Sequence, residues 1–134
     1  MKVVLYTNVF ISGIHWLGDS NKVLSMWRNE KFELIISLEI IEEIITTLKN
    51  FKIVLSEEEI GYWKDIILEN SLLVEPEEEI DIVKDDQDDN KFIEVAVMGK
   101  AKYIITQDNH LLKIKEFREI KILTPKEFLE IYEE

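Results

Sequence analysis

Two aspartates stand where regular elements of structure are expected to begin or end. Asp89 precedes an apolar run with helical period, and Asp108 follows the strand-like run from Tyr103 to Thr106. Carboxylates that are packed together repel each other and are hard to desolvate, so acids that meet at such edges indicate a cation between them. Hard divalent cations take oxygen ligands, and one or two carboxylates fix Mg²⁺ while it keeps several waters. The two residues therefore predict a divalent metal site.

Composition limits the class of protein that carries such a site. A chain of 134 residues fits one domain, here residues 1–134, and is long enough to bury a core. It has no cysteine, which excludes disulfides and thiolate metal sites and gives no sign of an oxidising compartment. The N-terminal apolar run is too short for a secretory signal, and no run approaches the roughly 20 apolar residues that span a bilayer. We expect a soluble, cytoplasmic protein with no membrane partner.

The net charge of -12 argues against indiscriminate attraction to nucleic acid, since phosphate binding normally depends on clustered Lys and Arg. It does not exclude an enzyme that acts on nucleic acid, because a bound metal would cancel part of the charge. The acids are concentrated between Glu75 and Asp89, where Lys84 is the only base. Basic residues gather in the last third of the chain, at Lys100, Lys102, Lys113, Lys115, Arg118 and Lys121.

Short strand signals alternate with helical ones along the chain. Strands are expected at residues 3–6, 33–36, 103–106 and 120–123, with a short strand or a helix exit at 72–74. Helices are expected at residues 20–28, 37–48, from 56 onward, from 88 or 89 to 99, near 111–112 and from 124 onward. The acidic stretch after Pro76 is expected to be irregular. This alternation predicts an α/β fold, a three-layer α/β/α sandwich with a mainly parallel central sheet.

Capping patterns support the helix starts. Ser37 is a plausible N-cap, and Ser56 with Glu59 has the spacing of a capping box. Thr124 and Glu127 have the same spacing around a proline that suits the first helical turn. Asp88 or Asp89 is expected to cap its helix, and Gly99 to end it.

The fold would bring several acids to one rim of the sheet. In open parallel sheets, sites form beyond the carboxyl ends of the strands, near the point where the strand order reverses. Tyr6 and Asp108 both follow strands, and Asp89 starts a helix, close to positive backbone N–H groups. Glu43 lies on the helix flank opposite the apolar pair of Ile41 and Ile45, so it could point toward the same rim.

Each of these residues also has a purely structural explanation. Asp89 can cap its helix, Asp108 can start a turn, and Glu43 can be an exposed helical glutamate. For each residue alone, the structural explanation is as good as a metal role. The three acids considered together favour a site. His15 and His110 lie in polar or loop-like contexts, which disfavours a role as general base.

Four segments, in this order and spacing, resemble a PIN domain over nearly the whole chain. The residues that carry the resemblance are Val3-Val4-Leu5-Tyr6-Thr7-Asn8-Val9-Phe10, the segment from Ser37 to Glu43, Asp89-Asn90-Lys91-Phe92-Ile93 with Ala96, and Thr106-Gln107-Asp108 with His110-Leu111-Leu112. The chain is most similar to small prokaryotic PIN proteins that are toxins of toxin-antitoxin pairs, whose ending also resembles residues 122–129.

The resemblance implies a metal-dependent ribonuclease that binds Mg²⁺ or Mn²⁺ at an acidic site. It implies that three of the catalytic and metal-binding acids are Glu43, Asp89 and Asp108. It also implies that three polar residues, Thr7, Asn8 and Thr106, orient ligands and waters. Asp86 and Asp88 are neighbouring acids that could assist Asp89. The implied partners are an RNA substrate, a cognate antitoxin and a second copy of the chain in a homodimer.

Tyr6 departs from the pattern, because the first acid of the family heads a D-T-N motif that reads Tyr6-Thr7-Asn8 here. A phenol with a pKa near roughly 10 stays neutral at pH 7, and its ring needs more space than a carboxylate. We therefore expect reduced or absent nuclease activity. The alternative is a non-catalytic module of the same fold that binds an antitoxin or RNA. A phosphotransfer fold is disfavoured, since it needs a nucleophilic aspartate at residue 6.

The three tryptophans have a simpler expected role than nucleic-acid binding. Trp16, Trp27 and Trp63 are expected to be core or dimer-contact residues rather than platforms on which bases stack.

Overall fold

The computed structural model describes residues 1–132, which form a six-stranded sheet in the order β3-β2-β1-β4-β6-β5. The strands are β1 (Lys2–Leu5), β2 (Glu33–Ile36), β3 (Ser71–Leu73), β4 (Tyr103–Ile105), β5 (Glu116–Phe117) and β6 (Ile120–Leu123). All neighbouring pairs are parallel except β5 with β6, which is antiparallel. The predicted mainly parallel sheet is confirmed.

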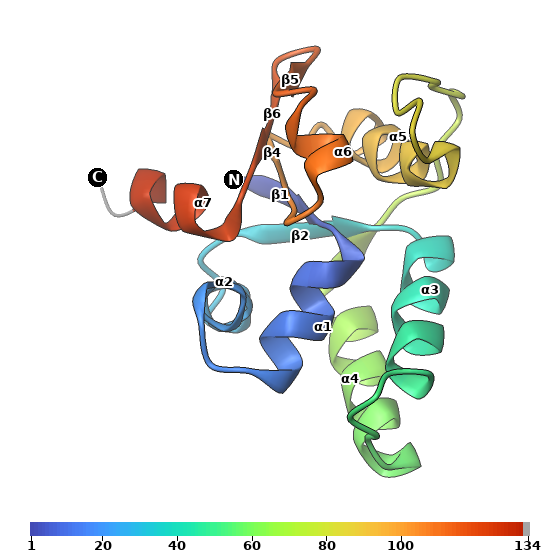
Figure 1. The fold of residues 1–134 in the computed structure, drawn as a ribbon, viewed down its shortest axis with the longest axis vertical. Coiled ribbons are helices and arrows are strands. Elements are labelled where there is room, and N and C mark those ends of the chain that lie inside the picture. Colours follow the sequence, from blue (N-terminus) through green and yellow to red (C-terminus); the bar gives the residue numbers. More distant parts are fainter. Residues whose placement is uncertain (133–134) are drawn as a thin grey trace.

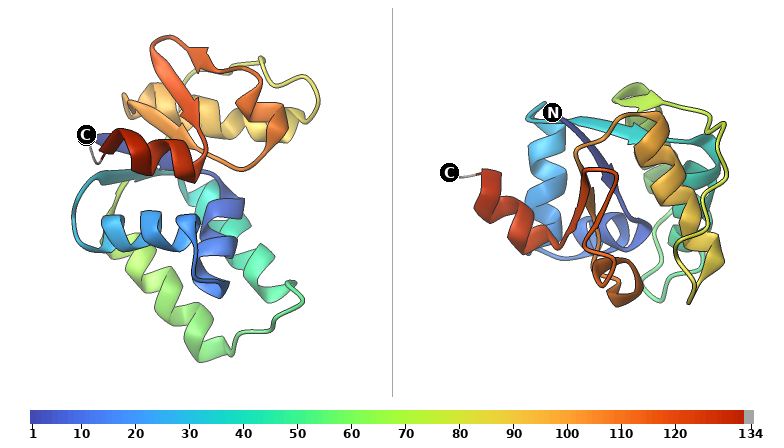
Figure 2. Two further views of the ribbon diagram at one scale, coloured as in Figure 1. Left: turned by 60° about the vertical axis from the view of Figure 1, so that its left-hand side comes forward. Right: turned by 90° about the horizontal axis from the view of Figure 1, so that it is seen from above.

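Helices cover both faces of this sheet (Figure 1). They are α1 (Thr7–His15), α2 (Asp19–Arg28), α3 (Leu38–Lys49), α4 (Glu57–Glu69), the 3-10 turn η1 (Gln87–Asp89), α5 (Asn90–Met98), α6 (Asn109–Leu112) and α7 (Pro125–Tyr132). The first four helices lie on one side of the strands and α5 lies on the other, as the views in Figure 2 also show. This is the predicted three-layer α/β/α arrangement. Within residues 1–132, no helix has the length and apolarity to cross a bilayer.

The strand register sets up the rim where a site can form. The apolar runs of β1 and β4 are buried, as expected for strands covered on both faces. Leu5 pairs with Ile105 at the carboxyl ends of the two strands, and the Tyr6 N–H donates to the Ile105 carbonyl at 2.9 Å. Tyr6 and the residues after Ile105 therefore leave the sheet side by side.

Local capping patterns were read correctly at three helix starts. The Ser37 side chain accepts from the Ile40 N–H, and Ser56 with Glu59 forms a complete capping box. Thr124 and Glu127 make the same two reciprocal bonds at the start of α7.

Three elements differ from the expectation. Helix α1 was not predicted, since its apolar residues Val9 to Ile11 are consecutive and Tyr6, at its N-cap, makes no side-chain cap bond. Strand β5 has only two residues, too few for a pattern. Strand β3 begins at Ser71, one residue earlier than expected.

The end of α5 also has a different cause from the expected one. Gly99 occupies the C-cap with φ of -84°, so it does not use the left-handed conformation, which Lys100 adopts instead with φ of 56°. A Cβ at Gly99 would overlap the side chain of Ile35. The glycine is therefore required for close packing of α5 on β2.

The tryptophans fall into different environments. Trp27 is 3% exposed and its Nε1 donates to the Asn70 carbonyl at 2.9 Å, as expected for a core residue. Trp63 is half-buried and packs against the core. Trp16 is 46% exposed, so it is not a core residue, and the alternative that it makes a dimer contact stays a prediction. It follows the last turn of α1, where the chain turns out toward α2.

Candidate functional site

A depression of about 380 Å³ lies beyond the carboxyl end of β1, between α1, α3 and the turn η1. It gathers most of the residues that the sequence singled out, and we call it the acid depression. Its lining consists of Tyr6, Thr7, Asn8, Ile11, Glu43, Thr47, Phe51, Asp86, Asp88 and Asp89.

Tyr6 and Asp89 form the centre of the acid depression. The Tyr6 hydroxyl donates to Asp89 Oδ1 at 2.7 Å, and the Tyr6 ring packs on Phe92 with ring centroids 4.5 Å apart. Asp89 is 3% exposed, and its Oδ2 is buried without a hydrogen-bond partner among residues 1–132. Asp89, one of the two predicted alternatives, occupies the N-cap position of α5. Asp89 makes no cap bond because its side chain faces Tyr6, and Asp86 caps the preceding η1 turn.

This pairing shifts the protonation of both groups. Burial raises the pKa of Asp89 to about 6, and the charges of Asp86, Asp108 and Glu43 add to the rise, while the hydrogen bond from Tyr6 opposes it. Burial, the hydrogen bond to Asp89 and the nearby negative charges raise the pKa of the Tyr6 phenol far above its usual range. Tyr6 is therefore a neutral donor and does not supply the anionic oxygen of an aspartate.

Lys91 pairs with two other acids of the acid depression, Glu43 and Asp88. Its Nζ lies 2.5 Å from Glu43 Oε1 and 2.8 Å from Asp88 Oδ2, and its side chain is 10% exposed. Burial lowers the pKa of Lys91, but hydrogen bonds to Asp88 and Glu43 outweigh that effect and raise it overall. The Thr7 hydroxyl donates to the other Glu43 oxygen. Both oxygens of Glu43 are thus occupied by groups of the protein itself.

The sequence reasoning missed the role of Lys91. Lys91 is 9% exposed, and the sequence analysis assigned it no role of its own. The available signal was a lysine in the first turn of a helix whose following residues, Phe92 and Ile93, are fully buried. A charged residue in such a position is rarely buried unless it is paired.

Asp108 lies outside the acid depression. It caps α6 by accepting from the His110 N–H at 2.8 Å, and its side chain is 25% exposed. The fully buried Thr106 fixes this turn, since its Oγ1 accepts from the Asp108 N–H at 3.0 Å. Asn8 joins the turn to α1 by accepting from the Gln107 N–H at 3.3 Å. Asp108 is still near enough for its charge to raise the pKa of Tyr6 and of Asp89.

The structure thus brings together five of the seven singled-out residues and leaves two in the adjoining turn. Tyr6, Thr7, Asn8, Glu43 and Asp89 line the acid depression. Thr106 and Asp108 belong to the connection between β4 and α6.

The donor set as arranged does not fit a divalent metal ion. One feature favours a cation, namely the buried and unpartnered Oδ2 of Asp89. Against it, the Tyr6 hydroxyl occupies the other oxygen, the Lys91 ammonium holds Glu43, and Asp108 caps a helix. Across residues 1–132, no three His, Asp or Glu side chains are grouped closely enough to hold a metal.

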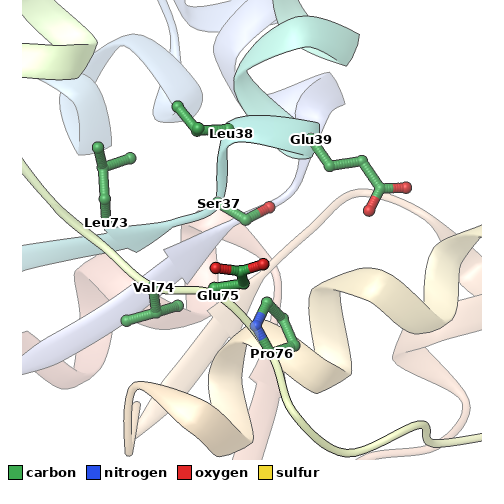
Figure 3. A pocket seen from close by; sticks show the side chains of 7 residues that line it. All are labelled: Ser37, Leu38, Glu39, Leu73, Val74, Glu75 and Pro76. Atoms are coloured by element: carbon green, nitrogen blue, oxygen red, sulfur yellow. The ribbon is translucent and has the colours of Figure 1, made fainter.

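A second depression, of about 460 Å³, lies at the carboxyl ends of β2 and β3 (Figure 3). Its lining is Ser37, Leu38, Glu39, Leu73, Val74, Glu75 and Pro76, which includes none of the predicted site residues. The carboxylates of Glu39 and Glu75 point in different directions in Figure 3. Its two acids do not converge, so the acid depression remains the candidate site.

Comparisons with known proteins show the family and the fold of the chain. The family model described as PIN domain matches residues 2–110. The uncharacterized protein MJ1680 of Methanocaldococcus jannaschii is 34% identical over 145 residues, which cover 99% of this chain and 92% of that protein. A crystal structure of VapBC2 from Rickettsia felis, bound to a DNA fragment from their promoter, contains a chain with the same fold. The TM-score is 0.59 at 16% identity, over 91% of this chain and 97% of that chain. The chain belongs to the PIN domain family.

Proposed function

We propose that the protein is the toxin component of a toxin-antitoxin pair, with a PIN-type ribonuclease site whose activity is reduced or lost. The family membership supports the nuclease origin, and the fold shared with a chain of VapBC2 supports an antitoxin as partner. We propose RNA as the substrate and a homodimer as the assembly, which light scattering of the purified protein would test.

The observation that carries the proposal is the hydrogen bond from Tyr6 to Asp89. PIN domains generally depend on divalent metal ions, and such an ion generates a hydroxide and offsets negative charge on a reacting phosphate. In this chain, the position of the first acid holds a neutral phenol that occupies an oxygen of Asp89. Glu43 is held by Lys91 and Thr7 in addition. Weak metal binding follows, and with it weak cleavage.

The reversion Tyr6→Asp tests this proposal. We expect Tyr6→Asp to cleave single-stranded RNA in the presence of Mn²⁺ or Mg²⁺ much faster than the wild type, because it restores an anionic oxygen beside Asp89 and removes the ring. The double variant Tyr6→Asp/Asp89→Asn is the control and should be inactive. Wild-type cleavage as fast as that of the revertant would refute the attenuation, and an inert revertant would refute the nuclease origin of the site.

A non-catalytic module that binds an antitoxin or RNA is the second candidate. It is favoured by the internal pairing of Glu43 with both Lys91 and Thr7. In that case Tyr6→Asp gains neither Mn²⁺ binding nor cleavage, while the antitoxin or RNA binds the wild type and the variant equally.

A further inference from the structure

An exposed group of aromatic and basic residues adjoins the acid depression. It consists of His15, Trp16, Lys49, Phe51 and Lys52, and we call it the aromatic patch. The residues come from the end of α1 and the end of α3 with the loops that follow them. Phe51 is central to the group, with its ring centroid 4.7 Å from that of His15 and 5.8 Å from that of Trp16.

The rings of the aromatic patch are held in place and partly open. The His15 ring is anchored through Nδ1, which lies 2.7 Å from the Ile11 carbonyl, and it stands 5.8 Å from the Trp16 ring. Trp16 is 46% exposed, and Phe51 and His15 are half-buried. An amphipathic aromatic surface of this kind, fixed by its neighbours, offers a face on which a planar group can stack.

The aromatic patch is continuous with the candidate site. Phe51 and Thr47 line the acid depression together with Tyr6 and Asp89. A bound polymer that lay across the aromatic patch would therefore continue into the acid depression.

The lysines give the aromatic patch its charge. Lys49 and Lys52 are exposed and flank Phe51 closely in sequence, and neither makes an ion pair with any residue from 1 to 132. Within residues 1–132, Lys84, Lys91, Lys113 and Arg118 are paired with acids, and the other lysines and arginines are unpaired like Lys49 and Lys52. In a chain of net charge -12, two exposed lysines that flank an aromatic cluster in sequence mark a place where a phosphate backbone can approach.

We propose that the aromatic patch binds single-stranded RNA, with an unpaired base stacked on the ring of Trp16 or of Phe51 and the neighbouring phosphates near Lys49 and Lys52. The inference rests on the proposed function, because the bound strand is the RNA that the acid depression would act upon. Leu17 and Val54, exposed by 93% and 78%, border the patch and would also suit contact with a protein. The two lysines next to Phe51 in sequence and the continuity of the patch with the acid depression favour RNA.

The test is fluorescence anisotropy of a short fluorescein-labelled single-stranded RNA, titrated with the full-length protein at low salt in EDTA. We expect Trp16→Ala and Phe51→Ala to weaken binding by roughly five- to a hundredfold, as for the loss of one stacked base. Trp16→Phe should retain most of the affinity. Lys49→Glu/Lys52→Glu should weaken binding and flatten its salt dependence. Tyr62→Ala is the matched control, since Tyr62 is a 54% exposed aromatic residue on α4 that lines neither the acid depression nor the aromatic patch.

Several results would overturn the proposal. These are unchanged affinity in Trp16→Ala and in the double lysine variant, an equal loss in Tyr62→Ala, equal binding of duplex RNA, or no binding of RNA by the wild type. Circular dichroism checks that each variant is folded. If light scattering shows that Trp16→Ala dissociates a dimer while RNA affinity is unchanged, the patch is a contact between copies. Because EDTA prevents metal-dependent cleavage, failure of this test is separate from failure of Tyr6→Asp to gain activity.

Discussion

Asp89 and Asp108 are the same residue type at the same rim of the sheet, yet their surroundings differ. Asp89 is 3% exposed, accepts from the Tyr6 hydroxyl and keeps one buried oxygen that has no hydrogen-bond partner within residues 1–132. The side chain of Asp108 is 25% exposed and caps α6 through the His110 N–H. The first carboxylate is held by a contact across the fold and the second by its own turn.

This difference shows what a shared ion would require. For both acids to ligate one metal, the second oxygen of Asp108 would have to meet Asp89 Oδ2, which has no hydrogen-bond partner among residues 1–132. Lys91 would also have to give up Glu43, from which its Nζ is 2.5 Å distant. In this structure the Tyr6 hydroxyl pairs with one oxygen of Asp89, and the Lys91 ammonium pairs with Glu43. The following predictions test that comparison.

Tyr6→Asp should give the largest change in stability. The variant loses the contact with Phe92 and places a second carboxylate beside Asp89, so we expect the metal-free protein to lose roughly 2–4 kcal/mol of unfolding free energy. Saturating Mn²⁺ should restore most of this loss, since a ligand at about 100 times its Kd adds about 2.7 kcal/mol. Urea denaturation with and without Mn²⁺ measures both effects. A loss that Mn²⁺ does not reduce would show that no metal site has been created.

Lys91→Met should cause the second largest loss of unfolding free energy. Removal of the ammonium leaves Glu43 partly buried without its cation, which should cost roughly 1–3 kcal/mol after allowance for the remaining exposure of Glu43. The matched control is Lys113→Met, which breaks the pair with Asp85, where the two side chains are 63% and 41% exposed. That exposed pair should contribute little to the unfolding free energy, because solvent and salt screen it. Equal losses in the two variants would contradict the special role of Lys91.

Asp89→Asn should change the pH dependence of stability. The folded-state pKa of Asp89 is raised from an ordinary 3.8 to about 6. The stability linked to its protonation is therefore fully present below the ordinary pKa and is lost as the pH rises through about 6. Between about pH 4.5 and pH 8, the variant should gain roughly 1–2 kcal/mol relative to the wild type. A difference that is independent of pH would show that Asp89 is ionised throughout this range.

Asp108→Asn should have the smallest effect. Asparagine caps helices about as well as aspartate, so the unfolding free energy should change by less than about 0.5 kcal/mol. Asp108→Ala, which removes the cap, should cost roughly 1 kcal/mol and serves as the reference. Thermal unfolding of both variants measures this. A large loss in Asp108→Asn would mean that the carboxylate has a role beyond the cap.

The sequence predicted the fold well wherever neighbouring residues carry the signal. The strands at 33–36 and 120–123, the capping boxes at Ser56 and Thr124 and the irregular acidic stretch follow from local patterns. Helix α1 was missed because burial, rather than a cap or an apolar stripe, determines it.

The site was less predictable, because its contacts join distant positions. The hydrogen bond from Tyr6 to Asp89 spans 83 positions, and the one from Lys91 to Glu43 spans 48. Spacing in the sequence placed the acids at one rim, but it could not show which of them is turned toward the others. The turn at Thr106, whose Oγ1 accepts from the Asp108 N–H, places the side chain of Asp108 as a helix cap.

Calorimetric titration with Mn²⁺ tests the central claim most directly, namely that Tyr6 and Lys91 take the place of a metal ion. The account predicts no measurable heat of binding for the wild type and a saturable site in Tyr6→Asp. A wild-type protein that binds Mn²⁺ as tightly as Tyr6→Asp would contradict it.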